Sequence, residues 1–240
     1  MSGFHIYIPT RTLFGAGMLN ELHRQKLPGT KAMIVTTAGK SVRENGALAR
    51  TQEQLTKAGV CSVLFDRVQA NPLKSTVMAG AAFAKDHGCD FLVALGGGSP
   101  MDVAKAVGVT AKYGGSITEY EGAHKVPGKI IPLIAIPTTA GTGSEVTAFS
   151  VITDHSRDYK LTVFSYKLFP SYAILDPELL TSAPASVAAA CGIDAFIHAE
   201  EAYVSTAASP FSDAMAEKAM ELIGKNIRRF VARRTDLEAA

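Results

Sequence analysis

The stretch FLVALGGGSPMDVAK, residues 91–105, joins a short apolar run to three glycines and then to a helical pattern. The run at 91–95 is apolar throughout, and Val103, Ala106 and Val107 recur at the three- and four-residue spacing of a helix. The stretch therefore predicts a buried strand, a glycine turn and a helix in direct succession.

The same alternation of strand and helix extends along most of the chain. Candidate strands lie at 33–37, 61–65, 91–95, 130–136 and 172–175, and helical patterns lie at 41–57, 73–87 and 100–112. Strands that are apolar on both faces, separated by helices, are typical of a parallel sheet that is covered on both sides. We therefore predict an α/β fold with a doubly wound, Rossmann-like parallel sheet over residues 1–180, with a hairpin at 151–163.

The pattern changes after residue 180. Residues 181–240 are Ala-rich, have helical spacing and contain no strand candidate through residue 231. We expect them to be the start of an all-helical domain that is incomplete within this sequence, with an apolar face left uncovered.

The composition excludes several classes of protein. With 47% hydrophobic and 19% charged residues, the chain has no mark of disorder. Its net charge of +2 is mostly scattered, which does not indicate a nucleic-acid partner. The longest apolar stretch, at 130–137, is too short to cross a bilayer, so no membrane association is expected. Three well-separated cysteines favour a reducing compartment, and we expect a cytoplasmic protein.

The glycine turn at 96–98 predicts an anion site. Glycines let the backbone approach a ligand closely, and the helix that follows directs free N–H groups and a positive dipole end at it. We expect Ser99 to cap this helix, Pro100 to occupy its first position and Asp102 to complete the capping arrangement. A plain strand-to-helix turn is the alternative, because the third glycine of G-x-G-x-x-G is absent.

A second loop of this kind, IPTTAGTGSE at 136–145, follows another buried strand. Its hydroxyl side chains are small donors suited to phosphate or ribose oxygens, namely Thr138, Thr139, Thr142 and Ser144. Ligands of doubly wound sheets bind outside the carboxyl ends of the strands, where both loops are expected to lie. A flexible surface loop is the alternative.

The helical segment CGIDAFIHAEEAYVS, 191–205, carries Asp194 and His198 four residues apart. That spacing places both side chains on one face, where they could bind one divalent metal. Two ligands do not fill a site that needs three or four, and an ordinary helix salt bridge is the alternative reading of the pair.

Together, GGGSPMDVAK, PTTAGTGSE and GIDAFIHAEEAYVS resemble the iron-containing (group III) alcohol dehydrogenases in order and separation. FHIYIPTRTLFGAG at 4–17 and DPELLTSAP at 176–184 are also similar, so the resemblance covers essentially the whole chain. Glycerol dehydrogenase and 3-dehydroquinate synthase share the architecture but match these motifs less well. The synthase, a lyase, also needs many His and Lys residues around its phosphate site, and these are absent here.

The resemblance implies hydride transfer between NAD or NADP and a small alcohol or aldehyde. A divalent metal, commonly Fe²⁺, would act as a Lewis acid on the substrate oxygen, with no protein nucleophile and no catalytic side chain beyond the metal ligands. It also implies a homo-oligomer. By motif position, Asp194 and His198 match the first two metal ligands. The cofactor cleft would be lined by Thr37, Asn71, Gly97, Gly98, Ser99, Asp102, Thr138, Thr139, Thr142, Lys160 and Leu179.

The sequence departs from the family at the end of the strand that finishes at Thr37. NAD-preferring members typically carry an Asp there, which binds the ribose hydroxyls and repels a 2′-phosphate. Here the turn is neutral, with Ala38 and Gly39 followed by Lys40 and Arg43. We therefore expect NADP to be used as well as NAD, or to be preferred.

A second departure concerns the metal. The family completes its site with two later histidines, whereas no His follows His198 in this sequence. The five others lie in the α/β region, and sequence alone leaves open a spatial role for His124 or His155. We expect this chain to bind nucleotide better than metal and to have little activity by itself. A non-catalytic NAD(P)-binding short form or fragment is the alternative function.

Overall fold

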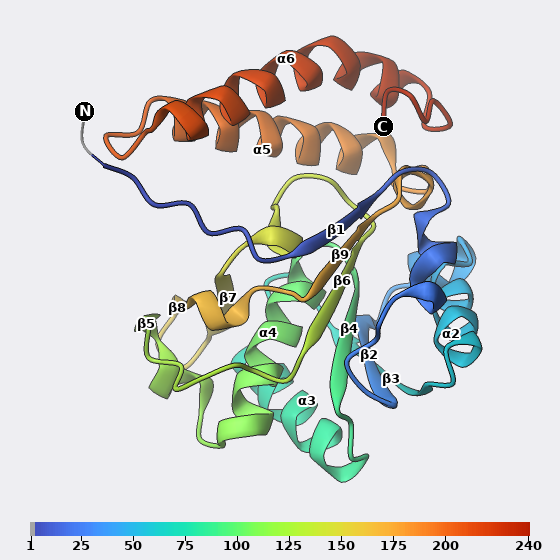
Figure 1. Ribbon diagram of the computed structural model, residues 1–240, viewed down its shortest axis with the longest axis vertical. Coiled ribbons are helices and arrows are strands. Elements are labelled where there is room, and N and C mark those ends of the chain that lie inside the picture. Colours follow the sequence, from blue (N-terminus) through green and yellow to red (C-terminus); the bar gives the residue numbers. More distant parts are fainter. Residues whose placement is uncertain (1–2) are drawn as a thin grey trace.

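The computed structural model describes residues 3–240. Its main sheet has six parallel strands in the order β1-β9-β6-β4-β2-β3 (Figure 1). The strands are β1 (Arg11–Phe14), β2 (Lys31–Thr37), β3 (Cys61–Val68), β4 (Phe91–Gly96), β6 (Leu133–Pro137) and β9 (Tyr172–Leu175). The helices are α1 (Ser41–Glu44), α2 (Ala47–Lys57), α3 (Lys74–Asp86), α4 (Gly98–Tyr113), α5 (Ala185–Tyr203) and α6 (Pro210–Ala232). The predicted α/β fold is therefore confirmed.

Both faces of the sheet are covered, as the apolar strands predicted. Side chains alternate between two cores: Met33 and Val35 of β2 belong to the core that includes α3 and α4. Ala32 and Ile34 belong to the opposite core, with α2 and the 3₁₀ helix η1 (Met18–Arg24). This two-residue alternation in a strand buried on both sides fixes the register of the sheet.

The order of the strands reverses between β2 and β4. The chain runs from β2 outward to β3, returns past β2 to β4, and then continues in the opposite direction to β6. The loops after β2 and β4 therefore leave in opposite directions, and in doubly wound sheets the ligand crevice lies between two such loops. The glycine turn after β4 and the Thr37 turn after β2 flank this crevice.

A small second sheet carries the predicted hairpin. Strands β7 (Phe149–Asp154) and β8 (Tyr159–Phe164) are antiparallel, and β5 (Gly122–Ala123) pairs with β8 in parallel. The remaining 3₁₀ turns are η2 (Ile117–Tyr120), η3 (Ser144–Val146), η4 (Tyr166–Leu168) and η5 (Pro177–Leu180).

The helices α5 and α6 pack against each other as a separate layer beyond the ends of the strands (Figure 1). A Cβ added to Gly192 would lie 2.3 Å from Cδ1 of Ile227, so the two helices approach each other closely at this glycine. Within residues 3–240, each helix is too short or too polar to span a membrane.

Two local expectations were wrong, and one strand was missed. The helix expected at 41–57 is broken between α1 and α2, because Gly46 adopts a left-handed conformation with φ of 76°. Strand β6 begins at Leu133 rather than at residue 130, after Pro132, which lacks an N–H for the ladder. Strand β1 was not expected, and it pairs with β9 at the edge of the sheet.

Candidate functional site

The glycine turn and the threonine loop, residues 138–144, close on each other at the crevice. A Cβ on Gly97 would lie 3.0 Å from Oγ1 of Thr139, and a Cβ on Gly98 would lie 2.9 Å from Cγ2 of Thr142. The N–H of Thr138 donates to the Gly96 carbonyl at 2.9 Å. The two glycines are thus required by the close approach of the second loop, and the structure brings these predicted residues together.

The expected cap on α4 is wrong. The helix begins at Gly98, with Gly97 as its N-cap residue, and no side chain within residues 3–240 caps it. Ser99 and Pro100 lie inside the first turn instead. The first N–H groups of this 16-residue helix are therefore left for solvent or a ligand.

Asp102 does not complete a capping arrangement, and its carboxylate instead ties α4 to the last residue of the threonine loop and to the hairpin. It accepts hydrogen bonds from Oγ of Ser144 at 2.7 Å and from the N–H of Val151 at 3.2 Å. Burial raises the pKa of this carboxyl, against the opposing effect of Lys105. Asp102 thus holds the loop and the hairpin in fixed positions relative to the glycine turn.

Lys105 completes this connection from one helical turn further along. Its side chain is fully buried, and Nζ donates to Ser144 Oγ at 3.0 Å, Thr147 Oγ1 at 3.2 Å and the Phe149 carbonyl at 2.8 Å. Burial lowers the pKa of Lys105 to about 8, although the negative charges of Asp102 and Glu145 oppose the shift. All three donors of the ammonium group are satisfied, which is what a buried lysine requires.

Asn71 and Lys160, both predicted to line the cofactor cleft, are in contact. Nζ of Lys160 donates to Oδ1 of Asn71 at 3.2 Å. Asn71 has a positive φ of 52°, a conformation that asparagine tolerates better than most residues. The N–H of Thr153 donates to the Pro72 carbonyl at 2.7 Å and so fastens the hairpin to the loop that carries Asn71.

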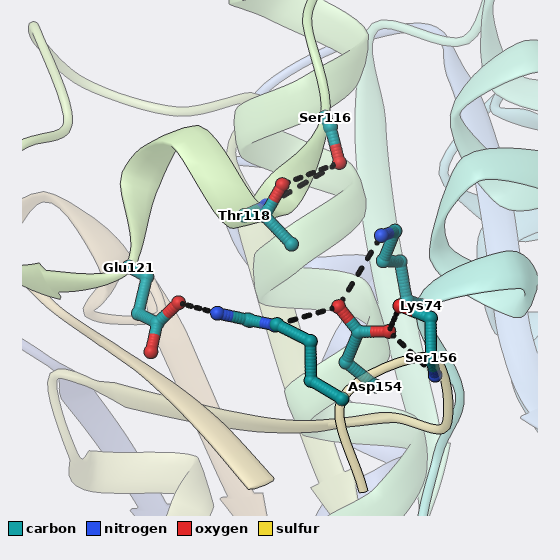
Figure 2. Close-up of polar contacts among 7 residues, drawn as sticks. Lys74, Ser116, Thr118, Glu121, Asp154 and Ser156 are labelled. Carbon is teal, nitrogen blue, oxygen red and sulfur yellow. Dashed lines mark hydrogen bonds and ion pairs between the residues drawn. The ribbon is translucent and has the colours of Figure 1, made fainter. Parts of the chain in front are cut away.

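The buried carboxylate of Asp154 anchors the same hairpin (Figure 2). Lys74 Nζ and Arg157 Nε lie 3.2 and 3.1 Å from Oδ2, and Ser156 Oγ donates to Oδ1 at 2.6 Å. Arg157 also pairs with Glu121 at 2.9 Å. The hydrogen bond from Ser156, together with the two cations, holds the pKa of Asp154 well below its usual range.

We expect Asp154→Asn to lower the melting temperature by several degrees, because the two cations and Ser156 lose a charged acceptor. The carboxylate stabilises the fold fully above its ordinary pKa of about 4, and this contribution is lost as the pH falls towards its lower folded-state pKa. Thermal unfolding should therefore show the two proteins converging in acid. Asp158→Asn, which removes the same charge from an exposed site in the same turn, is the control; equal effects of both substitutions would contradict the expectation.

Two predicted cofactor residues lie further from these contacts. Thr37 ends β2 and is half-buried beside the crevice. Leu179 lies in η5 and is only 2% exposed, packed in the core that contains Leu19 and Leu22. The side chain of Leu179 thus presents almost no surface of its own, and its role in the cleft stays a prediction.

The two candidate metal ligands lie on α5 opposite the threonine loop. Nε2 of His198 is 3.8 Å from Oδ1 of Asp194, and both side chains are about half exposed. Nδ1 of His198 is 3.3 Å from the Gly141 carbonyl, a contact that orients the ring with Nε2 towards Asp194. Within residues 3–240, no group of three or more His, Cys, Asp or Glu side chains could hold a metal, so His124 and His155 do not complete this site.

Two of the residues that organise the site were not predicted. Lys105 stands alone among apolar residues at 103–109, and a single lysine in such a run was a readable sign of a buried, paired cation. Asp154 had no comparable signal, because its partner Lys74 is 80 residues away in sequence.

The chain matches two family models. Residues 9–177 match the iron-containing alcohol dehydrogenases, and residues 188–240 match the C-terminal model of the same family. Among curated relatives, the NAD-dependent methanol dehydrogenase of Bacillus methanolicus is 39% identical over 98% of this chain and 62% of its own length. The 1,3-propanediol dehydrogenase of Klebsiella pneumoniae is 37% identical over 98% of this chain and 62% of its own length.

Solved structures agree with these matches. A 1,3-propanediol oxidoreductase superposes with a TM-score of 0.95 at 38% identity, over 99% of this chain and 62% of that one. A sulfoacetaldehyde reductase from Bifidobacterium kashiwanohense, in complex with NAD⁺, has a TM-score of 0.92 at 34% identity. The match covers 100% of this chain and 63% of that one. The chain thus spans about 62% of the length of these relatives. It belongs to the iron-containing alcohol dehydrogenase family.

Proposed function

We propose that this chain provides the nucleotide cleft and two metal ligands of an NAD(P)-dependent oxidoreductase of small alcohols or aldehydes. The observation that carries the proposal is the closure of the threonine loop on Gly97 and Gly98 at the point where the strand order reverses. A pyrophosphate fits this place, because it meets the uncapped N-terminus of α4 and the hydroxyls of Thr139 and Thr142.

Each part of the chain has a distinct task in this function. The nicotinamide ring, when bound, supplies the hydride chemistry. The first turn of α4 and the threonine loop bind the phosphates, while Asp102 and Lys105 hold both loops in place. Asn71 and Lys160, joined across the mouth of the cleft, would meet the remainder of the cofactor.

The metal site is incomplete within residues 3–240. Asp194 and His198 have the residue types and the proximity of two ligands, but two ligands do not hold a catalytic ion. We propose that further ligands come from residues outside this stretch. The described residues alone therefore account for nucleotide binding but not for a metal-assisted reaction.

We propose that NADP is accepted at least as well as NAD. Thr37, Ala38 and Gly39 place no carboxylate on the turn after β2, and Lys40 is exposed beside it. The named activities of the relatives, on methanol, 1,3-propanediol and sulfoacetaldehyde, favour a small alcohol or aldehyde as the substrate class.

Titration of the 240-residue chain tests the proposal. We expect NADPH and NADH to bind with dissociation constants in the micromolar range, read from nicotinamide fluorescence, with NADPH at least as tight. Zn²⁺ or Mn²⁺, followed by calorimetry, should bind only weakly, and Asp194→Asn or His198→Gln should abolish that binding. Absence of nucleotide binding would refute the proposal that these loops form a nucleotide cleft. Robust metal-dependent alcohol oxidation, lost in either variant, would refute the incompleteness of the metal site.

The second candidate is a non-catalytic nucleotide-binding protein, favoured by the two-ligand metal site. The same titration, carried out with the full-length protein, distinguishes this candidate from the oxidoreductase. A nucleotide sensor would bind NAD(P)H with no change on addition of metal and would oxidise no alcohol.

A further inference from the structure

A bulge in β3 places a carboxylate beside the turn that follows β2. Val35 pairs with Phe65 and Thr37 pairs with Val68, so β3 contains one more residue than β2 over this interval. Bulges of this kind redirect side chains at sheet edges. The extra length lies at Asp66 and Arg67, close to the carboxyl end of the edge strand.

The Asp66 side chain is paired with Arg43 of α1. Nη2 of Arg43 forms an ion pair and hydrogen bond with Oδ2 of Asp66, while Nη1 donates to the Gly39 carbonyl at 3.2 Å. The guanidinium is thus attached both to the turn after β2 and to the bulge of β3. The pair is only partly covered, with side-chain exposures of 35% for Arg43 and 42% for Asp66.

This position matters because β2 is the strand next to β4, which carries the glycine turn. In doubly wound folds, a pyrophosphate at such a turn leaves the adenosine ribose at the end of the neighbouring strand. The 2′ position of that ribose would therefore lie near the turn at Gly39, where Arg43 is held. Resting on the proposed nucleotide cleft, we infer that Asp66 is a specificity-determining residue that limits binding of a 2′-phosphate by restraining and neutralising Arg43.

Two physical effects act in the same direction. A guanidinium that is bound to a carboxylate has fewer free donors for the forked contact that a phosphate prefers. The carboxylate of Asp66 also adds a negative charge close to the site of the phosphate dianion, and this repulsion is absent when the ribose carries a 2′-hydroxyl. Removal of Asp66 relieves both effects for NADP and neither for NAD.

The test compares the dissociation constants of NADPH and NADH for the 240-residue chain and its variants. Asp66→Asn should tighten NADPH binding about fivefold or more and leave NADH within about twofold, as expected for one partly exposed charge interaction. Arg43→Gln should weaken NADPH selectively. In the Arg43→Gln variant, adding Asp66→Asn should improve NADPH affinity less than it does in the wild type, because there is no guanidinium to release. The gain in NADPH affinity should also shrink as salt is raised.

Glu21→Gln is the matched control, since it removes the same charge from an exposed arginine pair, Arg24–Glu21 at 2.9 Å, without touching the turn after β2. It should leave the NADPH to NADH ratio unchanged. If the wild-type chain binds both nucleotides and Asp66→Asn leaves their ratio as in the control, the inference about Asp66 is wrong while the cleft stands. If the wild-type chain binds neither nucleotide, the proposed function itself fails.

Discussion

Lys105→Met is expected to lower the free energy of unfolding by about 3 kcal/mol, the scale for removing one partner of a buried charged network. The substitution keeps the apolar part of the side chain. It leaves Ser144 Oγ, Thr147 Oγ1 and the Phe149 carbonyl without their donor. It also leaves the buried Asp102 carboxylate without the nearby positive charge. Urea unfolding followed by circular dichroism measures the change.

Lys112→Met is the control for this prediction. Lys112 lies on the same helix, is exposed, and donates a hydrogen bond to the Lys129 carbonyl at 2.6 Å, so its replacement should change stability by less than about 0.5 kcal/mol. A loss below about 1 kcal/mol for Lys105→Met would contradict the importance of the buried network.

The pH dependence gives an independent check. Because the folded-state pKa of Lys105 is about 8, below its ordinary value, the unfolded chain binds more protons at this lysine between that pH and about 10. The wild-type free energy of unfolding should therefore rise, relative to that of Lys105→Met, as the pH increases across this interval. Parallel pH profiles would show that the lysine titrates normally in the fold.

Gly98→Val is expected to weaken binding of both NADH and NADPH about 100-fold, or about 2.7 kcal/mol. A Cβ at this position would lie 2.9 Å from Cγ2 and 3.0 Å from Oγ1 of Thr142, so the threonine loop must move away from the glycine turn. That movement separates the two groups of donors that the phosphates require together. Fluorescence titration with each reduced nucleotide measures the loss.

The matched control is Gly224→Val on α6, where an added Cβ meets nothing within 4 Å. This variant should bind both nucleotides as the wild type does. Circular dichroism should show that Gly98→Val is folded, and tight nucleotide binding by that folded variant would mean that the cofactor does not depend on the contact between the two loops.

The sequence predicted those parts of the fold that depend on local pattern. Apolar strands, the helices α3 and α4, and the succession of strand, glycine turn and helix at residues 91–113 were readable, because side-chain periodicity reports burial directly. The break at Gly46 was also present in the sequence as an Asn–Gly pair, but the helical spacing on either side concealed it. Strand order was not readable, since it depends on contacts between residues far apart.

In the candidate site, too, local features were predictable and contacts between elements were not. The glycine turn and the threonine loop were identified from composition, yet the helix start was misplaced because Gly97, rather than Ser99, takes the extended conformation at the cap. The pairing of Arg43 with Asp66 could not be predicted, because it depends on a bulge that has no signature in residues 61–68. Geometry that arises between elements was visible only in the structure.

The pairing of β1 with β9 has a consequence for the synthesis of the chain. Arg11 and Tyr172 are 161 residues apart, and the N–H groups of Gly17 and Leu19 donate to the Asp176 carboxylate. Among the six strands of the main sheet, β1 is therefore the first to leave the ribosome and the last to find its partner. At roughly 5–20 residues per second it waits about 8–30 s, while the strands from β2 to β6 can already assemble behind it. Edge strand β1 thus completes the sheet instead of nucleating it.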